Sequence, residues 1–211
     1  MAEATRTFTS NDLARISSPS CEGCGECCRG MGDTIVLDPY DAHMLAYGLG
    51  RDFASLLNRE VELHLENGVI LPHLAMKGPA EACSFLGGDG RCGIHAIRPG
   101  ICRLYPLARQ YTDDGVRYFV LRDACAGHAM SKVRIRQYLG IPDLPEYERF
   151  KNDWFHFLSD AETAAQTAKD DQTRKELGLF LLETFFLRPY DGDFYELVRR
   201  RMKRARHFLM E

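Results

Sequence analysis

The residues of this sequence that are best able to do chemistry are its eight cysteines. Four fall within the segment CEGCGECC, and the other four follow before the helical last third of the chain. Thiolates bind zinc and iron–sulfur clusters, and thiols also form disulfides. The sequence therefore predicts either a metal centre or disulfide bonds. The thiols concerned are Cys21, Cys24, Cys27, Cys28, Cys83, Cys92, Cys102 and Cys125.

A metal centre explains these cysteines better than disulfides do. They make up 8 of 211 residues, which is below the roughly 8–10% of small disulfide scaffolds. The adjacent Cys27 and Cys28 are poorly placed to bond to each other, because a disulfide holds its two Cα atoms well apart. The N-terminal sequence MAEATRTFTSNDLAR lacks the apolar core of a secretory signal. We therefore expect a cytoplasmic protein whose thiols are ligands or redox groups.

The spacing of the thiols leaves the metal open. CxxCxxC matches the first three ligands of a bacterial iron–sulfur run, although the remote cysteine followed directly by proline is missing. A CxxC turn combined with two hairpin thiols would instead close a tetrahedral zinc site. Eight thiols suffice for two such sites, or for one cluster and one zinc. We favour an iron–sulfur cluster, such as 4Fe-4S, over zinc.

Arginines near the thiols are candidates to balance the charge of a metal–thiolate centre. Four thiolates leave Zn²⁺ or an oxidised four-iron cluster with a net charge of about −2. A guanidinium stays charged and donates in several directions. We expect Arg98 and Arg103, within RPGICR, to contact the bound metal group. Arg29 and Arg91 are equally well explained as surface charges.

Other chemistries find little support. His95 and His128 each follow a cysteine by three residues, but an ordinary hydrogen-bonded histidine is the simpler interpretation for both. GGDG lacks the Lys-Ser/Thr of a phosphate-binding loop, and no serine lies in the context of a nucleophile elbow. Whether the chain is an enzyme stays open at this point.

The combination of CEGCGECC with CSFLGGDGRCGIHAIRPGICRLYP resembles the YkgJ-type cysteine-cluster family. The shared motifs are CxxCxxCC and C-x8-C-x5-RPxxCRxYP, and the likeness covers about residues 15–128. This resemblance implies a domain that chelates zinc or iron, with an accessory, carrier or redox-sensing role. Similar cysteine clusters occur in flagellin lysine N-methylases, which implies an alternative function. In that case the chain would be an S-adenosylmethionine-dependent protein methyltransferase.

Local signals predict the following elements. Asp38 and Pro39 form a cap and first turn, so a helix is expected over residues 38–50. Its predicted apolar face contains Tyr40, Met44 and either Tyr47 or Ala46. Alternation around Asn67-Gly68 predicts a hairpin over residues 61–74, with the leucines of its first strand half-buried. Further hairpins are expected at CSFLGGDGRCGI and ARQYTDDGVRYFVLR, and helices at NDLARIS, FASLL, KVRIRQYLG, residues 147–168, LGLFLLETFF and residues 194–209.

The fold class that follows is α+β. A small hairpin-rich metal domain over residues 1–129 precedes an all-helical extension over residues 130–211, and no apolar run is long enough for a membrane span. The last helix carries an apolar stripe and a basic face, from Arg199 to Arg206. A solvated face explains these charges more simply than a partner does; the alternative is a contact with a protein partner or a polyanion.

Overall fold

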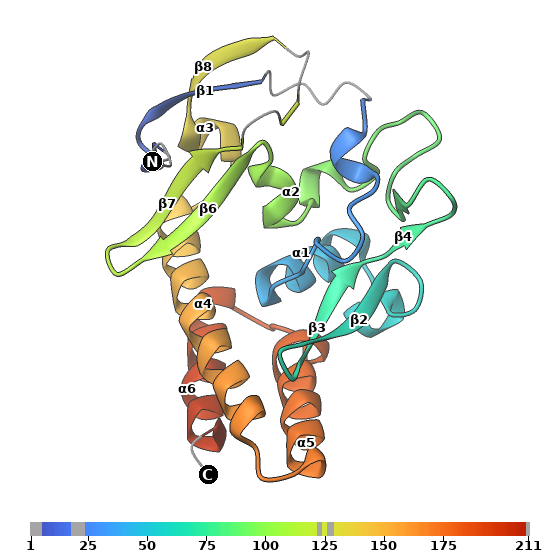
Figure 1. Cartoon of the computed structure of the whole chain (residues 1–211), viewed down its shortest axis with the longest axis vertical. Helices are drawn as coiled ribbons and strands as arrows, with labels where there is room; N and C mark the ends of the chain where they lie inside the picture. Colours follow the sequence, from blue (N-terminus) through green and yellow to red (C-terminus); the bar gives the residue numbers. More distant parts are fainter. Residues whose placement is uncertain (1–5, 18–23, 122–123, 126–128, 210–211) are drawn as a thin grey trace, which may run out of the picture.

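The structure is a computed structural model that describes residues 6–17, 24–121, 124–125 and 129–209. Its architecture is α+β, as predicted. Two-stranded sheets are spread through the N-terminal part, and α4 packs against both α5 and α6 in the C-terminal part (Figure 1). One hydrophobic core runs through both parts, and the domain boundary at residue 129 stays a prediction. The long C-terminal helices are α4 (Leu144–Thr167), α5 (Asp171–Leu182) and α6 (Phe194–Leu209).

The first strand lies where the sequence predicts a helix. The segment NDLARIS contains β1 (Leu13–Ser17), which pairs antiparallel with β8 (Met130–Arg134). Ala14 and Ile16 are buried and their neighbours between and before them are exposed, the alternation of a strand with one covered face. The helix predicted for KVRIRQYLG begins only at α3 (Ile135–Leu139). A pairing between distant segments has overridden local helical patterns at both places.

Helix α1 (Pro39–Leu49) begins and ends where predicted. The Asp38 side chain accepts a hydrogen bond from the Asp41 backbone N–H, and the Asp41 side chain accepts one from the Asp38 N–H, so the two form a reciprocal cap. Gly50 ends the helix in the left-handed conformation. Of the predicted face, Tyr40, Met44 and Ala46 are half-buried, whereas Tyr47 is 78% exposed; the fully buried side of the helix contains the Asp41 carboxylate.

The predicted central hairpin is present as β2 (Val61–Glu66) and β3 (Val69–Leu74), joined by a turn at Asn67 and Gly68. Its burial differs from the prediction. Strand β3 contacts α4 and α5 and is almost wholly covered, whereas Leu65 of β2 is 70% exposed. The helices pack against β3, so the alternating leucines of β2 do not mark a buried face.

The other two predicted hairpins differ in regularity. Strands β6 (Leu107–Thr112) and β7 (Gly115–Val120) form a full ladder whose turn is Asp113-Asp114. CSFLGGDGRCGI is a tight loop closed by a single bridge between Leu86 and Cys92. The remaining short elements are η1 (Glu26–Cys28), η2 (Phe53–Leu56), β4 (Met76–Lys77), β5 (Ala82–Cys83), η3 (His95–Ile97) and α2 (Gly100–Leu104).

The C-terminal helices form the larger share of the aromatic core. The stripe predicted for α6 is buried, and the segment LGLFLLETFF is buried on one side but leaves Leu179 exposed. Helix α5 continues into a π-helical turn, η4 (Glu183–Leu187), that places Phe185 and Phe186 against Trp154 of α4. Edge-to-face packing of aromatic rings stabilises the fold beyond the contribution of the area that the rings bury.

A buried ion pair joins the two parts of the chain. Lys151, on the otherwise apolar face of α4, donates to the Asp38 carboxylate at the start of α1. These residues are only 9% and 4% exposed. Burial lowers the pKa of Lys151, but the Asp38 charge and the nearby Tyr147 and Tyr111 together outweigh burial and hold that pKa above its ordinary value. Asp41, next to this pair, accepts a hydrogen bond of 2.7 Å from the Gly100 backbone N–H, which belongs to the first residue of α2.

We predict that Lys151→Met lowers the free energy of unfolding by about 3–5 kcal/mol, because it leaves the Asp38 carboxylate buried without its cation. Adding Asp38→Asn, which keeps the helix cap, recovers part of the loss. Urea unfolding of both variants measures this. The exposed Lys203→Met is the matched control, with a change within about 0.5 kcal/mol. Equal losses for Lys151→Met and Lys203→Met would show that the ion pair is unimportant.

Candidate metal centre

The CEGCGECC loop presents its thiols from a single short turn. Gly25 adopts φ 59°, in the left-handed region, immediately before η1, which contains Cys27 and Cys28. Glycine adopts this conformation without strain, and a Cβ there would also displace Arg29 Nη1, which lies 2.4 Å from that position. Arg29 closes the loop by donating to the Gly25 carbonyl at 3.2 Å. The Arg29 side chain therefore stabilises this turn.

The next two thiols flank the GGDG loop in the sequence, Cys83 before it and Cys92 after it. Cys83 is buried in β5, opposite Met76 of β4. Cys92 follows the loop and bridges Leu86. The loop is closed by backbone hydrogen bonds from Gly87 N–H to Arg91 O and from Gly93 N–H to Phe85 O, both 2.8 Å. Turns of this kind hold ligands without a core of their own.

Cys102 comes from the RPGICR segment, in the middle of α2. The Asp41 bond to the Gly100 N–H fixes the start of this helix. Gly100 has no room for a side chain, because a Cβ there would lie 2.0 Å from Tyr147 Oη of α4. The position of Cys102 therefore depends on α1 and α4 as well as on its own segment.

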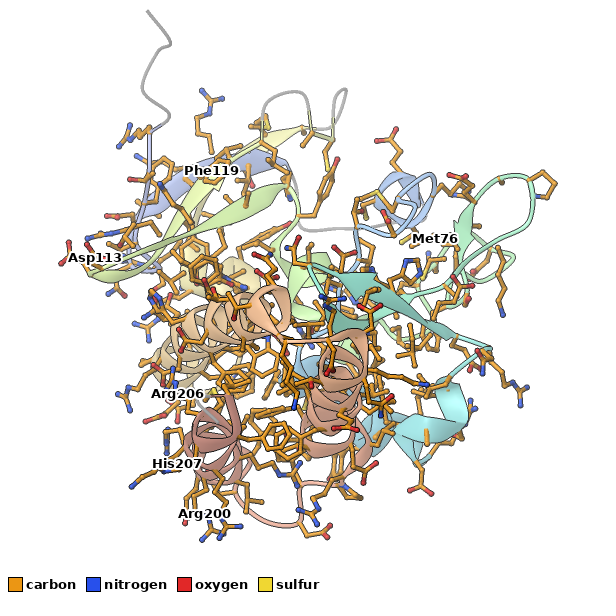
Figure 2. The ribbon with its side chains drawn as sticks, turned by 60° about the horizontal axis from the view of Figure 1, so that its bottom comes forward. Met76, Asp113, Phe119, Arg200, Arg206 and His207 are labelled. Carbon is orange, nitrogen blue, oxygen red and sulfur yellow. The ribbon has the colours of Figure 1, made fainter. Side chains whose placement is uncertain are left out.

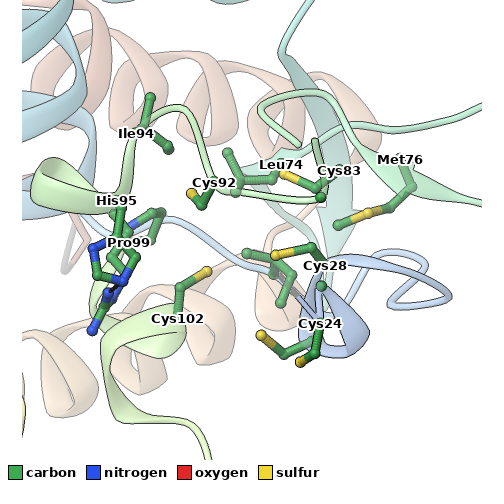
Figure 3. A pocket seen from close by; sticks show the side chains of 15 residues that line it. Cys24, Cys28, Leu74, Met76, Cys83, Cys92, Ile94, His95, Pro99 and Cys102 are labelled. Atoms are coloured by element: carbon green, nitrogen blue, oxygen red, sulfur yellow. Dashed lines mark hydrogen bonds between the residues drawn. The ribbon is translucent and has the colours of Figure 1, made fainter. Parts of the chain in front are cut away.

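Six of the predicted ligands line one pocket, with space of about 60 Å³ inside it. In Figure 3 the sulfurs of Cys28, Cys83 and Cys102 point toward the space between these three segments. Its walls are otherwise mainly apolar, from Ile35, Leu74 and Ile94. The thiols are Cys24, Cys27, Cys28, Cys83, Cys92 and Cys102.

The thiols are gathered but not yet in ligand geometry. Among residues that the structure describes, no three His, Cys, Asp or Glu side chains are arranged to hold a metal ion. A hydrogen bond with Cys28, together with burial, raises the pKa of Cys27, and burial raises that of Cys102. Neutral thiols do not repel one another and need not converge. The donor set nevertheless fits a thiophilic metal, which would replace the protons and draw the sulfurs together.

Arg98 and Arg103 take different positions. Arg98 lines the thiol pocket, contacts His95 Nε2 through Nη1, and has its buried Nε without a hydrogen-bond partner. Arg103 lines a neighbouring pocket and donates to the Ala96 carbonyl. Burial and the nearby Arg98 charge lower the pKa of Arg103. Of the two arginines, Arg98 is the one with a free donor at the thiols.

Cys125, another predicted ligand, is not among the described residues that line the pocket. Cys125 adopts φ 55° and lies near Tyr105, the residue that ends α2. Cys21 and the candidate histidine His128 lie outside the described residues. His95 is exposed and is a contact of Arg98.

Three charged residues near the site were not anticipated from the sequence. Asp41, Arg109 and Lys151 line a second cavity behind Cys27 and Cys102. A signal for Lys151 was present: it occupies a position on the apolar stripe of α4. Arg109 follows the buried Leu107 by two residues along β6, so the two side chains lie on the same face of the strand.

The basic face of α6 is largely engaged in local interactions. Arg199 pairs with Glu146 at 2.9 Å, Arg206 with Asp160 at 3.3 Å, and Arg200 with Glu196 at 3.6 Å. Figure 2 shows Arg200 and His207 projecting outward from the helix. Ion pairs to α4 therefore tie this helix to its neighbour and offset much of its charge.

Residues 20–126, half of the chain, match the family model CxxCxxCC, described as "Putative zinc- or iron-chelating domain". The chain belongs to this family. The match ends where the helical part begins and contains all eight cysteines. No curated protein and no solved structure matches the chain. Within the described residues, no helix is long and apolar enough to cross a membrane.

Proposed function

We propose that the chain chelates its metal in the thiol pocket between η1, the GGDG loop and α2. The observation that carries this proposal is the meeting of six thiols from segments almost 80 residues apart, from Cys24 to Cys102. Four or more thiolates satisfy zinc or a cluster without any other ligand. Cys21 and Cys125 stay predicted ligands, and the substitution of Cys125 described below tests the second of them.

Binding would bring the sulfurs together and release their protons. The resulting thiolate centre carries negative charge, and Arg98 supplies a free buried N–H and a positive charge to meet it. Closure would also stabilise the loops around the pocket, since a preformed site is rarely complete before its metal arrives. The group supplies structural cross-linking if it is zinc, and electron transfer or redox sensing if it is an iron–sulfur cluster.

We favour an iron–sulfur cluster. CxxCxxC on a turn with a left-handed glycine suits a backbone loop that wraps around a cube. Protein purified without oxygen is then expected to be brown and to contain iron and acid-labile sulfide. Metal analysis with a visible spectrum measures this. A colourless protein with stoichiometric zinc would replace the cluster with a zinc site, and metal-free protein with disulfides would refute chelation.

Cysteine substitutions test the ligand set. Cys83→Ser and Cys102→Ser are each expected to lose most of the bound metal and to lower Tm by several degrees, because a ligand and the cross-link that it makes are lost. Met76→Leu is the matched control, since Met76 lines the same pocket but supplies no thiolate. Full metal content in both cysteine variants would mean that the ligands are wrongly assigned. Cys125→Ser, measured alongside, decides whether Cys125 belongs to the set.

The cellular role that we propose is that of an accessory, carrier or redox-sensing protein. The alternative, a methyltransferase like flagellin lysine N-methylases, rests on the cysteine motif alone. Calorimetry of the metal-loaded protein with S-adenosylmethionine separates the two, because only a methyltransferase requires that cofactor. A polyanion contact through α6 also stays a prediction, and the ion pairs of Arg199, Arg200 and Arg206 weaken it.

A further inference from the structure

A second cavity lies directly behind the thiol pocket. It has a volume of about 530 Å³, and Cys27, Cys102 and Ile35 line both spaces. Most of its wall is apolar, while Arg109 and Lys151 bring two cations to its inner side. A cavity of this size with an apolar wall and a few polar groups is typical of a site for a small organic molecule.

Arg109 lacks an anionic partner in this cavity. Its Nη atoms reach the hydroxyls of Tyr111 and Tyr147 at 3.4 and 3.5 Å, longer than usual for N–H···O hydrogen bonds. Its Nε is buried without a hydrogen-bond partner, and it makes no ion pair with a described carboxylate. The Arg109 side chain is half-buried and lies 5.5 Å from the centroid of the Tyr147 ring, so tyrosines but no carboxylate or phosphate offset the partial removal of its charge from water. We therefore expect the anionic partner of Arg109 to be a bound ligand.

The other charges of the cavity do not meet this need. Lys151 is engaged with Asp38. The Asp41 oxygens accept hydrogen bonds from the backbone N–H groups of Asp38 and Gly100. Burial, with the nearby Asp38 charge, raises the pKa of Asp41 to about 7, so that this carboxyl carries only part of a charge at neutral pH. The cavity thus keeps a surplus of positive charge beside Arg109.

We propose that this cavity binds a small organic carboxylate. The planar fork of Arg109 matches a carboxylate, and the hydroxyl of Tyr111, which also lines the cavity, provides a further donor. The apolar wall, including Met31, Ile101 and Leu104, would cover the organic body. If the proposed function holds, such a ligand lies next to the metal, because Cys27 and Cys102 separate the two spaces.

The test uses the full-length protein as purified with its metal, and fluorine NMR of 4-fluorobenzoate as the probe. We expect binding to the wild type, at least tenfold weaker binding of the neutral 4-fluorobenzyl alcohol, and a loss of tenfold or more in Arg109→Gln. Arg117→Gln is the matched control: it removes the same charge from the same hairpin, at a position paired with Gln110 rather than on the Arg109 side. It should bind as the wild type does.

Several results would overturn the inference. These are no binding to the wild type, equal binding to Arg109→Gln, or displacement of the probe by inorganic phosphate at the same concentration as by benzoate. Metal content and Tm are measured on every variant. Loss of metal in Arg109→Gln would assign Arg109 to the metal site and overturn the inference while leaving the proposed function standing. If Arg109→Gln does not fold, Arg109→Lys keeps the charge without the fork and is expected to bind several-fold more weakly than the wild type; unchanged binding would contradict recognition by the fork.

Discussion

The fold depends on burying a lysine and two carboxyl groups together. Each would be costly alone, since removing an ion from water costs several kcal/mol even in a relaxed protein. Lys151 comes from α4, while Asp38 and Asp41 begin α1. Asp41 also holds the amide at the start of α2. Satisfying these groups therefore fixes three elements at once, and two of them lie more than 100 residues apart in the chain.

These buried charged groups fix the position of only one side of the thiol pocket. Cys102 follows the anchored amide of Gly100 by two residues, so its wall is rigidly placed. The opposite wall comes from the CEGCGECC and GGDG loops, which are closed by backbone hydrogen bonds and by Arg29 rather than by a core. A bound metal would link Cys102 of α2 to the cysteines of the two loops. This explains why so many ligands are drawn from segments with little regular structure.

Local signals sufficed where the structure depends on local interactions. The Asp38 cap, the Asn67-Gly68 turn and the extent of α6 follow from neighbouring residues, and they are as predicted. The family's motifs likewise indicate the chelating residue types. The errors occur where distant segments meet: β1 is a strand because β8 pairs with it, and Leu65 is exposed while α4 and α5 pack against β3 instead. The role of Lys151 also needed the fold, since its sequence position alone reads as an interruption in an apolar stripe.

Arg98 and Arg109 lie in different spaces beside Cys27, and each would balance a different negative charge. A centre with four thiolates carries about −2, and Arg98 lies on its side with a free donor. Arg109 lies on the other side of Cys27 and Cys102, in the cavity that also contains Asp41 and Lys151. There it faces tyrosine hydroxyls instead of thiols. Two anionic groups in contiguous spaces, a metal–thiolate centre and an organic carboxylate, would each meet one guanidinium, and the shared cysteines would bring them into contact.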